Sequence, residues 1–241
     1  MKKIDRSFSI IAKAITLNLV NICIYYPKMM YMAKHPERYS DTYKYKYGIR
    51  IINAVIKACR IKINAYGLEN LPKNQGFYLC ANHQENFDPL AIWSSFPGKV
   101  GVILNDKACH RPFIKELCVL IKSKKLIHDN MHSILSSFDS VTKELKAGTN
   151  YLVFPEGEYE SEYNKLSEFH AGCFKSPRRA KCPIVPVVIK NSYRIFDKGF
   201  LTTLPIDVHY LNPIYPEEYE NLTTKELAVY VRDKIKSAYI K

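Results

Sequence analysis

The sequence lacks the cysteine pattern of an exported or zinc-stabilised protein. Its seven cysteines are odd in number, and no two of them form a C-x-x-C pair. Disulfide frameworks use even sets of cysteines, and structural zinc sites use closely spaced pairs. In "HDNMH", His128–His132, two histidines have the spacing of zinc peptidases, but Asp replaces the Glu base and no third ligand is evident. We therefore expect free thiols in a reducing compartment and no metal site.

Motifs for secretion and for nucleic-acid binding are also missing. The opening stretch "MKKIDRSFSIIAKAITLNLVNICIYY" starts with basic residues, but no small-residue cleavage site follows its apolar part. The basic clusters "KSKK" at 122–125 and "KSPRRAK" at 175–181 occur without a helix-turn-helix, zinc-finger or RNP-like pattern. We expect an intracellular protein that binds no nucleic acid.

Acidic residues are few relative to basic ones. The chain has 36 Lys and Arg against 23 Asp and Glu, which gives a formal net charge of +13 at pH 7. Such a balance favours an anionic partner. Beside a lipid bilayer with anionic headgroups, each basic residue near the surface contributes about 1 kcal/mol of attraction. With nucleic acid set aside, we predict an anionic membrane surface as a partner.

No long, uninterrupted apolar run is present. Residues 8–26 come closest, but four polar residues interrupt them: Lys13, Thr16, Asn18 and Asn21. A spanning helix needs about 20 nearly continuous apolar residues. Apolar residues instead recur at helical spacing, at Ile11, Ile15, Leu19 and Ile22. Aromatic and basic residues follow, at Tyr25, Tyr26, Lys28, Tyr31 and Lys34. We favour a helix lying in the membrane interface, with a core-packing helix and a spanning helix as alternatives.

The rest of the chain alternates between strand and helix patterns. Strand patterns occupy 59–66, 76–83, 99–106, 124–130, 150–157, 182–193 and 205–215. Helix patterns occupy 40–60, 88–96, 111–121, 133–147, which Gly148 ends, and a last segment that a capping box at Thr223 opens. This alternation predicts an α/β fold with a mixed, mainly parallel sheet covered by helices on both faces. We assign residues 1–58 to an N-terminal amphipathic helical membrane-association segment and residues 59–241 to the main domain.

The stretch "YLCANHQENFDPLAIW" places a histidine at the end of a predicted strand. Open α/β sheets hold ligands beyond the carboxyl ends of their strands, where we expect His83. We predict that Asp88 caps the next helix, that Pro89 takes its first position, and that the Asp88 carboxylate reaches back to the His83 Nδ1–H. That contact fixes the tautomer and leaves the other ring nitrogen able to take a proton from an alcohol. By spacing alone, a helix-capping Asp and an ordinary loop histidine remain the alternative.

Four blocks of sequence, in order, resemble the glycerolipid acyltransferase family, which includes bacterial 1-acylglycerol-3-phosphate acyltransferases. They are "YGLENLP", "NHQENFDPL", "YLVFPEGEYES" where the family has Phe-Pro-Glu-Gly-Thr-Arg, and "CPIVPVVI". "FHAGCFK" and "NPI" fit the spacing between and after the last blocks. The resemblance covers about residues 60–220.

The resemblance implies a reaction and a set of site residues. The family moves a fatty acyl group from a coenzyme A or acyl-carrier-protein thioester to a glycerol hydroxyl, without a metal or other cofactor. A lysophosphatidate-type lysolipid is the implied acceptor, and the cytoplasmic face of the cell membrane is the implied location, with peripheral or monotopic association. His83 and Asp88 match the catalytic dyad. The implied acceptor-binding residues are Lys107, Phe154, Pro155, Glu156, Gly157 and Lys175.

Two blocks depart from the family pattern where it binds phosphate. Glu158 and Tyr159 stand in place of Thr-Arg, and Asp129 and Asn130 stand in place of Asp-Arg. Neither Tyr nor Asn replaces the bidentate contact of arginine with phosphate. Basic residues elsewhere are candidates to compensate: Lys107, Lys175, Arg178 and Arg179. An acyltransferase for a lysolipid without a terminal phosphate, and a non-catalytic lipid-binding relative, therefore stay open.

Overall fold

The computed structural model describes residues 19–105, 109–126, 131–157, 166–196 and 202–239. Within these residues seven strands form one sheet. The strands are β1 (Ile61–Tyr66), β2 (Tyr78–Ala81), β3 (Val100–Asn105), β4 (Lys124–Leu126), β5 (Asn150–Val153), β6 (Ile184–Lys190) and β7 (Leu204–Tyr210). The α-helices are α2 (Leu19–Lys34), α3 (Asp41–Ala58), α4 (Asp88–Ser95), α6 (Ile114–Leu120), α7 (Met131–Lys146), α8 (Lys175–Ala180), α9 (Pro216–Tyr219) and α10 (Thr224–Tyr239). The 3-10 turns are η1 (Pro36–Arg38), η2 (Leu68–Asn70), η3 (Ala171–Phe174) and η4 (Ser192–Phe196).

The sheet is mixed and mainly parallel, as predicted. Its strand order is β1-β7-β6-β2-β5-β3-β4, and every neighbouring pair is parallel except β6 with β7. β2 lies between β5 and β6, so its carboxyl end faces the same edge of the sheet as theirs. A residue that follows β2 is therefore brought beside residues that follow β5 and β6.

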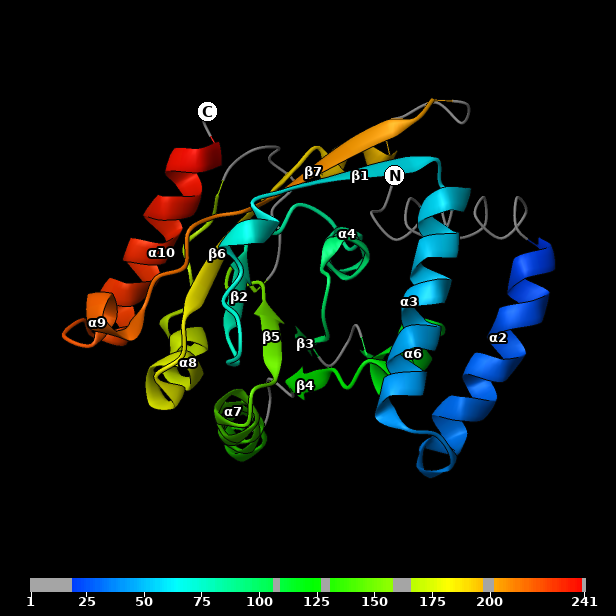
Figure 1. The fold of residues 1–241 in the computed structure, drawn as a ribbon, viewed down its shortest axis with the longest axis horizontal. Coiled ribbons are helices and arrows are strands. Elements are labelled where there is room, and N and C mark those ends of the chain that lie inside the picture. The colour runs from blue at the N-terminus through cyan, green and yellow to red at the C-terminus, as the bar shows by residue number, and fades with distance from the viewer. Residues whose placement is uncertain (1–18, 106–108, 127–130, 158–165, 197–201, 240–241) are drawn as a thin grey trace.

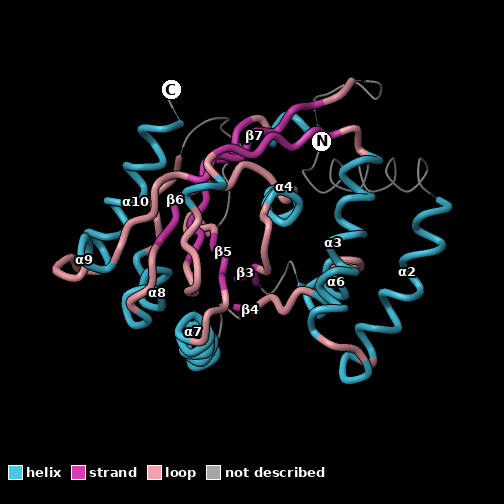
Figure 2. Tube along the Cα trace, in the orientation of Figure 1, coloured by secondary structure: helices cyan, strands magenta, loops and turns pink. Residues whose placement is uncertain are grey.

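Helices cover the sheet on both faces (Figures 1 and 2). Side chains of β2 alternate between the two resulting cores, as expected for a strand buried on both sides. Leu79 and Ala81 pack with α3, α4 and α6, whereas Tyr78 and Cys80 pack with α7 and α10. The predicted helix and strand patterns recur as elements where the structure describes them, which confirms the α/β class.

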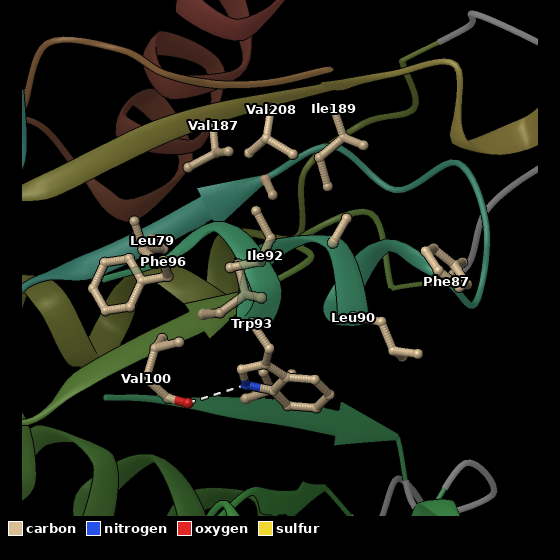
Figure 3. Packing of buried hydrophobic residues seen from close by; sticks show 14 of the residues in the cluster. Leu79, Phe87, Leu90, Ile92, Trp93, Phe96, Val100, Val187, Ile189 and Val208 are labelled. Atoms are coloured by element: carbon tan, nitrogen blue, oxygen red, sulfur yellow. Dashed lines mark hydrogen bonds between the residues drawn. The ribbon is translucent and has the colours of Figure 1, made fainter. Parts of the chain in front are cut away.

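α4 fills the core directly behind the end of β2. Figure 3 shows Ile92 and Trp93 of this helix among side chains of the neighbouring strands, including Leu79 and Val187. The indole Nε1–H of Trp93 donates a hydrogen bond of 3.1 Å to the Val100 carbonyl oxygen. Burial of the apolar surface of α4 thus fixes the helix whose first residue is Asp88.

Two predicted helix boundaries are confirmed in detail. Gly148 follows α7 with a φ of +90°, in the left-handed region that glycine reaches without strain. At the start of α10 the Glu226 N–H donates to Thr223 Oγ1 at 3.2 Å, and the Thr223 N–H donates to Glu226 Oε2 at 2.7 Å. This is the predicted capping box.

The N-terminal helices pack on the rest of the molecule. Met29 and Met32 of α2 have no exposed surface, and they pack with Tyr47 and Ile51 of α3 and with Leu120 of α6. Ile52 and Ile56 of α3 also belong to the core that covers β2. Most of the predicted interfacial segment, residues 8–18, lies outside the described residues. The interfacial helix and the boundary at residue 58 therefore stay predictions.

Candidate active site

His83 and Asp88 lie in contact at the carboxyl end of the sheet. β2 ends at Ala81, and His83 follows in the loop that leads to α4. His83 Nδ1 lies 2.7 Å from Asp88 Oδ2. The histidine side chain is 14% exposed and the aspartate side chain is fully buried. The loop therefore presents an imidazole whose ring is oriented by a buried carboxylate.

Asp88 does not cap α4 as predicted. The helix begins at Asp88 itself, the capping position belongs to Phe87, and Pro89 is the second helical residue. The carboxylate is directed instead toward the preceding loop, where Oδ2 accepts hydrogen bonds from the backbone N–H groups of Gln84 at 2.6 Å and Glu85 at 2.8 Å. The capping prediction was wrong because it considered only the helix, whereas the tight loop brings two backbone donors and the His83 ring to the same oxygen.

Asn82 joins the loop to the neighbouring strand. It is buried, its amide Nδ2–H donates to the Ile189 carbonyl oxygen at 3.0 Å, and its Oδ1 accepts from the Ile189 N–H at 2.7 Å. These bonds continue the pairing of β2 with β6 beyond the last strand residue. Asn82 therefore fixes the position from which the His83 backbone leaves the sheet.

Glu156 binds the backbone of His83 directly. One carboxylate oxygen accepts from the His83 N–H at 2.7 Å, and the other accepts from the Ser167 N–H at 2.8 Å. Burial raises the pKa of the Glu156 carboxyl, and these two hydrogen bonds offset part of the rise because they stabilise the charged form. Glu156 therefore links the predicted dyad loop with Ser167.

Of the other residues of "FPEG", Phe154 contacts the imidazole of His83, and Pro155 and Gly157 lie against His170. The ring of Phe154 stacks on that of His83, with centroids 4.5 Å apart. The Pro155 carbonyl oxygen accepts from the His170 N–H at 2.8 Å. Gly157 has a φ of +76°, and a Cβ there would meet the His170 ring at 3.1 Å. The structure thus brings Phe154 and Glu156 together with His83, although they are about 70 positions away in sequence.

The predicted basic residues are spread more widely. Lys107 lies outside the described residues, as do Asn130, Glu158 and Tyr159. Lys175 is exposed at the start of α8, and no described hydrogen bond or ion pair joins it to His83, Asp88 or Glu156. The helix leads into the amino end of β6, whereas His83 follows the carboxyl end of the parallel strand β2.

Several basic residues have partners on the surface. Arg178 donates to the Glu220 carbonyl oxygen at 3.2 Å, and Arg179 pairs with Asp139 at 2.6 Å. In the other basic cluster, Lys122 pairs with Asp41 and Lys124 pairs with Glu144, each at 2.5 Å. These contacts show part of both clusters engaged in ion pairs and hydrogen bonds within the protein.

Sequence reasoning missed four residues that hold the site. They are Gln84, Ser167, Arg232 and Tyr239. Gln84 lies within the "NHQENFD" block, but its partners Ser192 and Tyr239 are more than 100 positions away. No local pattern indicates a contact over such separations.

A protein-family model described as acyltransferase matches residues 62–190. This range holds the His83 loop, "FPEG" and β6, and it is more than half of the chain. The chain belongs to the acyltransferase family. The resemblance inferred from the four sequence blocks is thereby confirmed.

Curated relatives of this acyltransferase carry consistent names. A probable 1-acyl-sn-glycerol-3-phosphate acyltransferase of Mycoplasma pneumoniae is 24% identical over 221 residues, covering 85% of this chain and 81% of that protein. The 1-acyl-sn-glycerol-3-phosphate acyltransferase of Saccharomyces cerevisiae is 28% identical, covering 73% of this chain and 59% of that one. The Borreliella burgdorferi enzyme of the same name is 25% identical, covering 73% of this chain and 70% of its own length.

A solved structure shares the fold. The crystal structure of the 1-acyl-sn-glycerophosphate (LPA) acyltransferase PlsC from Thermotoga maritima superposes with a TM-score of 0.74 at 19% identity, and the match covers 98% of this chain and 96% of that one. In the part of this acyltransferase that the structure describes, none of the helices has the length and apolar character to cross a bilayer.

Proposed function

We propose that this acyltransferase transfers a fatty acyl group from a thioester to the free hydroxyl of a lysophosphatidate-type glycerolipid, as a step of phospholipid synthesis. The observation that carries the proposal is the 2.7 Å contact between His83 Nδ1 and Asp88 Oδ2 at the carboxyl end of the sheet. The names of the relatives support the choice of acceptor.

In this mechanism His83 is the general base and Asp88 orients it. The Nδ1–H donates to Asp88, so Nε2 has no proton and takes one from the acceptor hydroxyl as the oxygen attacks the thioester carbonyl carbon. The negative charge of Asp88 stabilises the imidazolium that forms. When the tetrahedral intermediate collapses, the carbon–sulfur bond breaks and the leaving thiolate recovers the proton from His83. The products are the acylated lipid and the free thiol, and no acyl-enzyme forms.

The remaining groups have supporting roles in the proposal. Phe154 holds the imidazole face and Glu156 holds the His83 backbone. Lys107, Pro155 and Gly157 complete the acceptor side by family resemblance. Lys175 was also implied by that resemblance, but it precedes the amino end of β6 and is not part of the proposed acceptor side. The donor is an acyl-coenzyme A or an acyl carrier protein thioester.

An acceptor panel tests the assignment of lysophosphatidate. We expect purified protein and a thioester donor to acylate lysophosphatidate, because the site lies in a strongly basic protein and its relatives carry that name. The released thiol is measured with lysophosphatidate, glycerol 3-phosphate and headgroup-bearing lysophospholipids in parallel. Turnover of only the headgroup-bearing acceptors would reject the phosphate-bearing acceptor and would assign the changes at Glu158, Tyr159 and Asn130 to a different specificity.

Membrane association is the second part of the proposal. Residues 1–58 hold the catalytic domain on the anionic cytoplasmic face of the membrane. The net charge of +13 supports this, as do aromatic and basic side chains on α2 and α3. Lys28 Nζ lies 5.4 Å from the ring centroids of both Tyr43 and Tyr47, and Tyr43 is 43% exposed. Aromatic rings beside basic groups suit the headgroup region of a bilayer.

Cosedimentation with vesicles tests the membrane surface. We expect binding to vesicles that contain anionic lipid, weaker binding as salt screens the charges, and no retention on DNA. Neutral vesicles are the control. Binding to DNA without binding to anionic vesicles would reverse the assignment of the partner.

A further inference from the structure

The C-terminal helix α10 is fixed firmly to the face of the sheet that carries Tyr78 and Cys80. Its residues Leu227, Val231 and Ile235 have no exposed surface and belong to the core on that face. The helix packs on β6 and η3, and Figure 1 shows it alongside β6. α10 thus provides a rigid support that reaches the edge of the sheet where His83 lies.

One side chain of α10 holds the segment behind Glu156. Arg232 Nε–H donates to the Ser167 carbonyl oxygen at 2.9 Å, and an Nη2–H donates to the Leu166 carbonyl oxygen at 3.3 Å. The Ser167 N–H in turn donates to Glu156, which accepts the His83 N–H through its other oxygen. A continuous series of hydrogen bonds therefore runs from Arg232 to the backbone of His83.

A second side chain of α10 holds the next residue of the loop. Gln84 Nε2–H donates to the hydroxyl of Tyr239, seven residues beyond Arg232 and about 10 Å further along the helix. Gln84 Oε1 accepts from the N–H of Ser192 at 3.2 Å and from its hydroxyl at 3.0 Å. The backbone N–H of Gln84 also donates to Asp88 Oδ2. Tyr239 therefore holds Gln84, the residue that follows His83 in the loop.

We propose that α10 is a positioning element of the catalytic site, in which Arg232 and Tyr239 set the backbone of His83 and Gln84. The inference rests on the proposed function of His83 as general base. Residues 82–87 form an irregular loop, so their geometry depends on contacts from outside the loop. A displacement of about 1 Å at a reacting group reduces the rate by about 100-fold. Arg232 suits the task because its planar guanidinium has donors for two successive carbonyl groups.

The arrangement has a consequence for the dependence of activity on pH. Loss of Arg232 releases Ser167 and weakens its hydrogen bond to Glu156. That bond lowers the pKa of the carboxyl, which burial has already raised, so its loss raises the pKa further. Glu156, which accepts the His83 N–H, then becomes protonated at a higher pH. The acid limb of the pH–activity profile should therefore shift to higher pH. A mere loss of folding stability does not explain such a shift.

The test compares four variants of the full chain. We expect Arg232→Gln to lower kcat by about 10- to 100-fold with little change in the KM of either substrate, and to shift the acid limb of kcat/KM upward. Arg232→Lys should restore part of the rate, because one carbonyl contact survives. Tyr239→Phe should lower kcat with no shift of the acid limb. Lys234→Gln, which changes an exposed basic residue of the same helix that lies over the Tyr230 ring, is the matched control and should behave like the wild type.

Two further measurements separate positioning from stability and from the proposed reaction. Ile235→Val loosens the packing of α10 without removing either contact, and it should lower thermal stability and leave the pH profile unchanged. The backbone amide resonance of His83 reports its hydrogen bond to Glu156 whatever the reaction, and it should shift in Arg232→Gln but not in Lys234→Gln. An unchanged amide resonance and an unchanged pH profile in Arg232→Gln would overturn the proposal. If the resonance shifts while no acceptor is turned over by the wild type, the proposed function fails and the positioning contact stands.

Discussion

Replacing His83 with alanine is expected to reduce acyl transfer to the background rate without unfolding the protein. Removing a general base costs about 10²- to 10⁴-fold in rate, and His83 is the base in the proposed mechanism. The fold should survive because the hydrogen bond to Glu156 comes from the backbone N–H, which alanine retains. The measurements are thiol release with saturating donor and acceptor, and urea unfolding followed by circular dichroism.

A matched histidine variant serves as the control. His209 also stacks on an aromatic ring, Tyr66, with centroids 4.7 Å apart, compared with 4.5 Å for His83 on Phe154. His209→Ala therefore removes a similar ring contact without touching the dyad, and it should keep most of the activity. Near-wild-type turnover by His83→Ala would refute its role as the base.

Asp88→Asn is expected to lower the activity by about 10²- to 10⁴-fold. The substitution replaces one carboxylate oxygen with an NH2 group and leaves the size and shape of the side chain almost unchanged. Three groups converge on Oδ2: the His83 ring nitrogen and the N–H groups of Gln84 and Glu85. An asparagine that meets them with its oxygen has no charge with which to stabilise the imidazolium. The NH2 group of the asparagine then takes the place of Oδ1, and that position is buried and offers no hydrogen-bond partner among the described residues.

Comparing two substitutions at Asp88 separates chemistry from folding. Asp88→Ala leaves the partly buried N–H groups of Gln84 and Glu85 without their acceptor, which should lower the free energy of unfolding by about 1–3 kcal/mol in total. Asp88→Asn should lower stability less and activity almost as much. Asp139→Asn removes a carboxylate from an exposed ion pair and is the control. A turnover rate for Asp88→Asn close to that of the wild type would reject the orienting role.

The local parts of the site were predictable because they depend on neighbours in sequence. His83 and Asp88 are five residues apart, and a strand end followed by a helix start brings such residues together in many conformations of the loop. The capping box at Thr223 and the stop at Gly148 follow from groups within one turn of the helix. Even so, the helix-capping role of Asp88 was predicted wrongly, because the backbone donors of the loop compete with those of the helix for the same carboxylate.

The sequence by itself determined the α/β class, the order of the elements and the pairing of His83 with Asp88. The spacing of apolar residues indicates which faces of the helices and strands are buried, and so predicts the fold class. The His83–Asp88 pair is predictable because the polar groups of a short loop have few partners within reach. Only the tertiary structure decided that Glu156 binds the His83 backbone, that Arg179 pairs with Asp139, and that Arg232 and Tyr239 reach the loop from α10. The physical reason is that these contacts join segments whose separation in space is set by the packing of the whole sheet and its helices. No pattern of neighbouring residues encodes a distance of that kind.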